Sequence, residues 1–501
     1  MKNSSMPERG YHRAQAPRRG PMRAPQRAAM LLAGLVLVAG AGVGCQSSER
    51  RPLDLTSTRE AWLARSPSDE TTRQFADRLA QAEGLGDAGA FDPADGLTLA
   101  EAEPVALVFN RDLRLARLEA NVTRATADHA GVWDDPVLGV DIERIVSSMP
   151  DPWVIAGTVG LTIPISGRLA VEKARAGAEY AAELQRVAAQ EWATRAALRE
   201  LWVQWSAETT RLALATELVE RLRSVYALAE RQEQAGVMSK IDARLFRVEL
   251  AGSEADVIAA TARAKELELQ LRDILGLAPG APVCFIETVA FEPRGIDPSW
   301  LQSMMESANP ELLAVRGEYD VAEESLRLEV RKQYPDLTIG PGYGTDQGDD
   351  RVLLGLRLPL PLWNRNRQGV AQATANREVA RGRYQNTFEH LASKLTIAQT
   401  RFAASRAVRE AVESRVLPLA DEQDADVRRV AELGRVDPLL LLQAIKSQYD
   451  AKVRLVDARV AEATGGIRLD ELIGPPAPTS SSKVPESSPA NPRTPTPGGR
   501  P

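Results

Sequence analysis

The sequence predicts a mainly helical protein built from two copies of one unit, each adding two short strands to long antiparallel coiled-coil helices. Three observations predict this fold. Only 5% of the 501 residues are aromatic while 26% are charged, a composition that favours long helices. Gly167–Ala235 and Asn366–Leu433 are long stretches rich in Ala, Glu, Arg and Leu. Short motifs in the first half recur in the second half about 200 residues later.

The recurring motifs keep their spacing. Asn110-Arg-Asp-Leu resembles Asn309-Pro-Glu-Leu, and a Pro lies 26 residues after each Asn, at Pro136 and Pro335. Further on, VGLTIPI resembles LGLRLPL, and GVMSKID resembles GRVD, with the offset reduced to 195 residues by a shorter loop. Because a repeat of this length is far longer than a solenoid unit, it indicates a duplicated half-molecule.

Four segments alternate between apolar and other residues, as half-exposed strands do. They are Val137–Ile145, Val154–Ile165, Leu337–Gly344 and Val352–Pro359. The alternation fits either a small antiparallel sheet on a soluble core or strands of a membrane β-barrel, with apolar residues toward lipid. Four strands cannot close a barrel, so the second interpretation requires several copies of the chain. Asp141, Glu143 and Arg357 would then be candidates for the lumen lining.

The helices have matching lengths. The two long stretches have 69 and 68 residues, or about 100 Å each at 1.5 Å per residue, which implies coiled-coil packing. The helices before and after them have about half that length, so two stacked end to end match one long helix; they are predicted at Ala100–Trp133, Asp242–Leu275, Leu301–Tyr334 and Leu439–Glu471. Gly236 and Gly434 suit the turns, and Asp437 before Pro438 suits a helix start.

The N-terminus has the pattern of an export signal. Seven basic residues precede Ala28–Gly44, an uncharged segment too short for a comfortable membrane span. The ending AGVGCQ resembles a bacterial lipoprotein signal and predicts lipidation, with palmitate, at Cys45; an ordinary cleaved signal or an uncleaved anchor is the alternative. The net charge of −6 argues against a nucleic-acid partner.

Taken together, the motifs resemble the TolC-type family of outer-membrane efflux proteins. They are GLRLPLPLWNRNRQG, the NPEL and YPDL pair with its earlier copy, and GVMSKID with GRVD, and the resemblance spans Leu97–Leu472. It implies a homotrimer in outer-membrane lipid, with a twelve-stranded β-barrel joined to a twelve-helix periplasmic α-barrel. It also implies two partners, a periplasmic adaptor (membrane fusion protein) and an inner-membrane pump of the RND type.

The resemblance carries further expectations about sites and cargo. The family docks its adaptor at the tip of the helical hairpins, which here comprises Gly236, Val237, Ser239, Asp242, Gly434, Val436 and Asp437. The PLPLWNRNRQG form most resembles members that work with heavy-metal pumps. The expected function is therefore a passive export conduit, with metal cations as candidate cargo. A lipid-anchored periplasmic coiled-coil scaffold or adaptor is the alternative.

No enzyme, cofactor or tight metal site is expected. The sequence has no nucleophile elbow, HExxH motif or phosphate loop, and His129 and His390 lie far apart without Cys or His at ligand spacing. The predicted organisation is a signal peptide, an N-terminal linker segment, a first repeat, a second linker, a second repeat and a disordered Pro/Ser-rich tail, at 1–44, 45–97, 98–275, 276–300, 301–472 and 473–501.

Overall fold

The computed structural model describes residues 48–83, 91–146, 153–346, 349–432 and 437–476, in two units divided after Glu60. In the first unit, Asp54 starts α2 (Leu55–Leu63) by accepting backbone N–H bonds from Thr56 and Ser57 at 3.0 and 3.1 Å. The second unit contains all the elements that follow. The predicted sites Cys45, Gly434 and Val436 lie outside the described residues.

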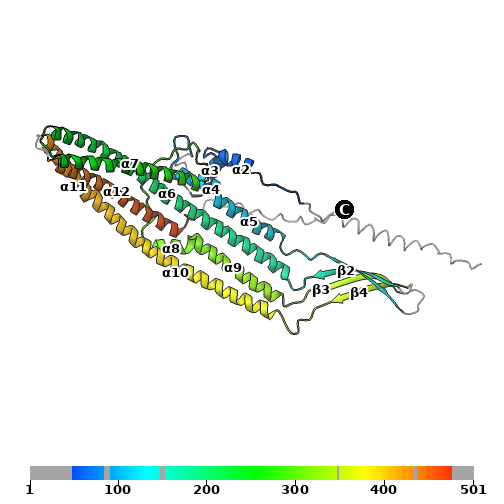
Figure 1. Ribbon diagram of the computed structural model, residues 1–501. Helices are drawn as coiled ribbons and strands as arrows, with labels where there is room; N and C mark the ends of the chain where they lie inside the picture. The colour runs from blue at the N-terminus through cyan, green and yellow to red at the C-terminus, as the bar shows by residue number, and fades with distance from the viewer. Residues whose placement is uncertain (1–47, 84–90, 147–152, 347–348, 433–436, 477–501) are drawn as a thin grey trace, which may run out of the picture. The chain divides into compact units, whose positions relative to one another are not determined.

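The second unit contains two successions of the same elements (Figure 1). The first consists of α3 (Glu70–Glu83), α4 (Leu99–Phe109), α5 (Arg111–His129), β1 (Val137–Arg144), β2 (Trp153–Ile163), α6 (Arg168–Gln234) and α7 (Lys240–Ile274). The second consists of α8 (Pro298–Ala308), α9 (Pro310–Arg331), β3 (Leu337–Asp346), β4 (Asp349–Arg357), α10 (Arg367–Ala411), the π-helix η1 (Val412–Val416), α11 (Leu417–Glu432) and α12 (Pro438–Ile473). Apart from α3, which has no counterpart in the second succession, both follow the predicted order: a helical segment, two strands, a long helical segment and a returning helix.

The long helices form one layer, which we call the wall. Near the sheet, α6 contacts α5 on one side and α9 on the other, and α9 contacts α10. Away from the sheet, α6 contacts α7 and α12, and α12 contacts α10 and α11. The predicted end-to-end stacking of half-length helices along α6 is confirmed. The wall therefore has two side edges, one made by α5 and α7 and the other by α10 and α11.

The prediction of a single helix before each strand pair is wrong, because each of these two helices is broken at an asparagine. The side-chain oxygen of Asn110 accepts the backbone N–H of Leu113 at 3.1 Å, and its amide donates to the Ile274 carbonyl at 2.9 Å. Asn309 repeats this arrangement, with its amide donating to the Leu472 carbonyl at 2.8 Å. One side chain thus caps the start of a helix and the end of the helix stacked on it.

The second long helix runs from Arg367 to Glu432, as predicted, but it is not α-helical throughout. The Leu417 N–H donates to the Val412 carbonyl, five residues back, in the π-helix between α10 and α11. Pro418 follows directly; it has no N–H, and its ring collides with the preceding turn of an α-helix. A π-turn with one extra residue accommodates such a clash. The first long helix, α6, contains no proline and runs unbroken for 67 residues.

The strands form one antiparallel sheet in the order β1-β2-β3-β4. Leu138 pairs with Val159, and Pro341 pairs with Leu354. Cross-strand partners point to the same face of a sheet, so the predicted apolar rows of all four strands lie together on one face. Within the described residues β1 and β4 have free outer edges.

Candidate functional site

The apolar face of the sheet is exposed in the single chain. Val352, Leu354 and Leu356 on β4 are 87, 70 and 67% exposed, and Val140 and Ile142 on β1 are similarly uncovered. Soluble proteins rarely leave a contiguous apolar patch of this kind in water. The strands have 8 to 11 residues, close to the roughly 9–11 that a tilted strand needs to cross a bilayer.

The opposite face is polar and rich in glycine. Asp141 pairs with Ala156, Glu143 with Val154, and Arg357 with Thr338. The strand register places these three predicted lining residues on one face, opposite the apolar rows. Nearby, Arg351 and Asp346 form an ion pair at 2.7 Å. This face could line an aqueous space.

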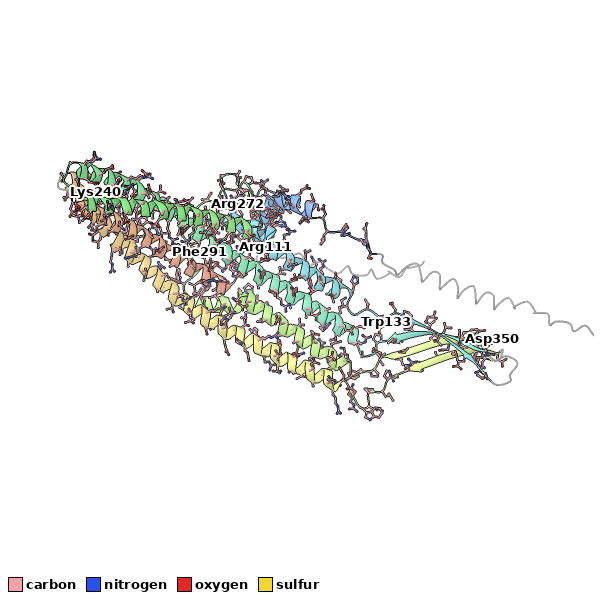
Figure 2. All side chains as sticks on the ribbon, in the orientation of Figure 1. Arg111, Trp133, Lys240, Arg272, Phe291 and Asp350 are labelled. Atoms are coloured by element: carbon pink, nitrogen blue, oxygen red, sulfur yellow. The ribbon has the colours of Figure 1, made fainter. Side chains whose placement is uncertain are left out.

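Aromatic side chains surround the junction between wall and sheet. Trp133 precedes β1, Tyr334 precedes β3 and Trp363 follows β4; they are 56, 58 and 84% exposed. Figure 2 shows Trp133 where the helices of the second unit give way to strands. Amphipathic aromatic rings favour the boundary between lipid and water, so this junction fits a membrane surface.

The far end of the wall is the tip, where α6 turns into α7 and α12 begins (Lys240 in Figure 2). Gly236 has φ +71°, the left-handed conformation expected of it, and Val237 is 77% exposed. Ser239 accepts the backbone N–H of Asp242 at 3.1 Å, and the Asp437 carboxylate accepts that of Leu439 at 3.0 Å. The predicted cap at Asp437 is confirmed.

Both tip helices therefore start with a fixed geometry. Sequence reasoning missed Ile241, which is 80% exposed beside these caps. The sequence feature that could have indicated Ile241 is an apolar residue in the first turn of α7. Together with Val237 it gives the tip an apolar contact area.

A buried charge cluster joins the two repeats midway along the wall, and sequence reasoning missed it. Glu103 on α4 accepts from Arg195 at 2.6 Å and from Arg199 at 2.5 Å, both on α6. Arg199 also donates to the carboxylate of Asp470 on α12 at 2.6 Å, and Arg294 donates to the same carboxylate at 2.5 Å. We call these five residues the Glu103 cluster. They come from four places in the chain, so no local pattern could reveal it.

Aromatic rings complete the cluster's surroundings. The guanidinium carbons of Arg195, Arg199 and Arg294 lie 5.1 to 5.6 Å from the Trp192 ring centre. The Trp192 indole N–H donates to the Glu471 carbonyl at 2.9 Å. Stacked cations are stabilised by the ring face. The cluster thus fixes the C-terminal end of α12 against α6.

Burial alone would raise the pKa of Glu103, but the guanidinium groups of Arg195 and Arg199 outweigh it and hold the pKa below its usual 4.5. A carboxyl group with a lowered folded pKa stabilises the protein above its unfolded pKa. This stabilisation is therefore complete above about pH 4.5 and is lost as the pH falls through the lowered value.

We expect Glu103→Gln to lower the free energy of unfolding by about 2–3 kcal/mol at pH 7, because the carboxylate that pairs with Arg195 and Arg199 loses its charge in a buried site. The difference from the natural protein should shrink as the pH falls below about 4.5, because the unfolded chain then takes up a proton at Glu103 that the folded protein resists. Urea unfolding at pH 7, 5 and 3 measures this. A constant difference at all three values would contradict the assignment.

No group of three or more His, Cys, Asp or Glu side chains that could hold a metal ion occurs in the part of the chain that the structure describes. Cys284 is a free, exposed thiol. Among the described residues, no helix combines the length and apolar character needed to cross a membrane.

The fold and surfaces define a class: a duplicated membrane protein whose strands face lipid and whose helices project from the sheet. The sequence model of the family described as "Outer membrane efflux protein" matches residues 104–277 and 301–475. The chain belongs to this family and is located in the outer membrane. The two matched segments confirm the duplicated half-repeat.

Individual relatives agree with this membership. The chain is 26% identical over 248 residues to the cobalt-zinc-cadmium resistance protein CzcC of Cupriavidus metallidurans. That alignment covers 49% of this chain and 59% of CzcC, so the chain spans less than two thirds of this relative's length. Two solved channels share the fold at 16% identity: OprN, with a TM-score of 0.64 over 87% of this chain and 99% of OprN, and CusC, with 0.63 over 75% and 92%.

Proposed function

We propose that the chain is the outer-membrane channel component of a tripartite efflux system, a passive conduit that receives its cargo from a pump and a periplasmic adaptor. The observation that carries this proposal is the four-stranded sheet with one exposed apolar face and two free edges. An open sheet edge is not tolerated in lipid, so β1 of one copy must pair with β4 of another. A closed ring with an aqueous interior follows.

Three copies give twelve strands, within the range of membrane barrels that begins at about eight. The homotrimer, the adaptor and the RND-type pump are supported by family membership. The chain carries no phosphate-loop motif, so the energy for transport comes from a partner. Docking of the adaptor is assigned to the tip residues Gly236, Val237, Ser239, Asp242, Gly434, Val436 and Asp437, with Ile241 added from its exposure.

Metal cations are the proposed cargo class, supported by the similarity to a cobalt-zinc-cadmium resistance protein and by the polar sheet face. Lipidation at Cys45 and the predicted division of the chain into signal, repeats, linkers and tail belong to the same proposal. The periplasmic scaffold is the second candidate function. It leaves the apolar sheet face unexplained.

The test is single-channel conductance of the detergent-extracted protein in a planar bilayer. Discrete openings are expected, together with an oligomer that dissociates on a gel only after heating. A closed entrance could keep the pore silent, so the measurement is repeated with Asp437→Ala, which removes the cap at the tip. A protein that stays monomeric and conducts in neither form would contradict the channel. The periplasmic scaffold would then be the remaining function.

We expect the double substitution Asp141→Asn with Glu143→Gln to reduce cation preference without closing the pore. The two carboxylates lie on the proposed lumen face of each copy, and rings of acidic side chains favour cations in such pores. The reversal potential in a salt gradient should move toward that of a non-selective pore by about 10 mV or more. Asp112→Asn on α5, outside the sheet, is the matched control.

A further inference from the structure

The row of apolar residues in β4 continues beyond the end of the strand. The ladder between β3 and β4 stops at Arg357. Leu358, Leu360 and Leu362 then keep the spacing of two residues that the apolar residues have within the strand, and they are 46, 66 and 58% exposed. The residues between these leucines are prolines, which have no N–H to extend the ladder. An apolar surface thus reaches from the sheet toward the start of α10.

Basic residues follow this apolar segment directly. Trp363 is 84% exposed, and the sequence then reads Asn-Arg-Asn-Arg to Arg367. The Arg365 Nε donates to the Pro361 carbonyl oxygen at 3.2 Å, while its terminal amino groups have no partner in the described part of the chain. Arg331 and Arg367 are exposed, and within the same ranges neither side chain forms an ion pair or a hydrogen bond.

The backbone of this turn is unusual. Arg365 and Asn366 have φ values of +46° and +48°, and among the described residues they are the only ones other than glycine with a positive φ. Because such residues rarely adopt this conformation, contacts must hold it. The Asn366 side-chain amide donates to the Glu329 carbonyl oxygen at 2.9 Å and to the Glu329 carboxylate at 2.7 Å. These bonds fasten the turn to the end of α9 and fix the direction in which Arg365 projects.

The same contacts bring three arginines to one level. Gly369 lies against the Glu329 carboxylate, and α9 and α10 run in opposite directions. Arg331 follows Glu329 by two residues, and Arg367 precedes Gly369 by two residues. Because both helices have the same rise per residue, these two arginines are level with each other. With Arg365 in the adjoining turn, three guanidinium groups lie close to the point where the apolar segment ends.

The acidic side chain that faces this turn is already engaged. The Glu329 carboxylate accepts from Lys332 at 2.6 Å as well as from Asn366, so within the described residues the three guanidinium groups keep uncompensated positive charge. Guanidinium groups match a phosphate through paired N–H···O bonds. The described part of this turn offers no free carboxylate for an ammonium group, so a headgroup with net negative charge fits better than a zwitterionic one.

We propose that Leu358–Arg367 binds an anionic phospholipid of the periplasmic leaflet. The acyl chains lie against the three leucines, and the headgroup phosphate lies between Arg365 and Arg367, with Arg331 beside them. The inference rests on the proposed channel, whose sheet spans the membrane. A segment that leaves the membrane meets acyl chains first and headgroups next, which is the order of apolar and basic residues found here.

Native mass spectrometry of the full-length protein released from detergent measures the preference. The probes are equal amounts of phosphatidylglycerol and phosphatidylcholine with the same acyl chains, and phosphatidylglycerol should be retained at least about fivefold more often. Arg365→Gln with Arg367→Gln should reduce this preference to less than about twofold; an unchanged preference would overturn the proposal. Arg401→Gln with Arg415→Gln removes the same charge from exposed positions further along the same long helix and should have no effect.

Two comparisons separate this site from other causes. Arg365→Lys with Arg367→Lys should keep part of the preference, because an ammonium group still pairs with phosphate but lacks the planar fork. If the Lys variant assembles and shows no preference, charge does not bind the lipid and the proposal fails. If the Gln variant loses the heat-labile oligomer but keeps the lipid preference, a second copy of the chain occupies this segment, and the proposal fails as well.

Failure of the lipid site is distinct from failure of the channel. An oligomer that conducts but shows no preference for phosphatidylglycerol would overturn the lipid site alone. A monomer that neither conducts nor retains phospholipid would overturn the channel and the lipid site together.

Discussion

Arg199→Met is expected to lower the free energy of unfolding by about 3–5 kcal/mol, because it removes one partner from a buried ionic network. Arg199 bridges Glu103 and Asp470, whose side chains are only 8 and 4% exposed. Without it each carboxylate keeps a single guanidinium partner. Urea unfolding of the detergent-solubilised protein, followed by the helical circular dichroism signal, measures the change.

Arg468→Met is the matched control. Arg468 pairs with Glu200 and Glu471 at 2.7 Å, but its side chain is 54% exposed, so its loss should cost no more than about 1 kcal/mol. Equal effects of the two substitutions would show that burial does not set the strength of the Glu103 cluster. Arg199→Lys should fall between them, since one ammonium group cannot hold two carboxylates in the planar geometry of a guanidinium.

Local patterns in the sequence predicted the elements well, and the failures have a common physical cause. Period-two alternation located the strands, and the repeat located the turns, because both signals depend on neighbouring residues. The breaks at Asn110 and Asn309 were visible only as a repeated motif. Their role depends on carbonyls 164 and 163 residues away, and such partners cannot be read from spacing alone.

The π-turn before Pro418 is a different kind of failure, because its signal was local. A proline inside a predicted helix indicates a kink or break, and the compositional similarity to the first long stretch concealed it. The Glu103 cluster had no local signal. Four of its members are charged residues within helices, where a solvated position is the ordinary expectation, and Arg294 precedes α8. Only the packing of α4, α6 and α12 buries Glu103, Arg195 and Asp470.

The two repeats share a joint that explains why the motif was kept twice. Asn110 binds the end of α7 and Asn309 the end of α12. The residues just past those ends, Gly276 and Gly474, both have left-handed φ values, +69° and +78°. The paired half-length helices therefore meet through one geometry in both halves of the wall, at the height where the hydrophobic clusters lie.

Gly276→Ala is expected to destabilise the protein by about 3 kcal/mol or more. A Cβ at this position would lie 2.1 Å from the Phe109 carbonyl oxygen, so the break between α4 and α5 would have to move away from the end of α7. Part of the cost, about 1–2 kcal/mol, is the left-handed backbone itself. The rest comes from the displaced backbone and from weakening of the Asn110 bond to Ile274, worth about 0.5–1.5 kcal/mol.

The chain supplies a control that separates these terms. Gly236 has φ +71°, but a Cβ there would meet nothing within 4 Å, so Gly236→Ala should cost only the backbone term of about 1–2 kcal/mol. Gly474→Ala should behave like Gly276→Ala, since its Cβ would lie 2.1 Å from the Ala308 carbonyl oxygen. Urea unfolding of all three variants decides the matter. If the joint variants cost no more than the tip variant, the two helix ends are not in tight contact, and the paired asparagines alone hold the joint.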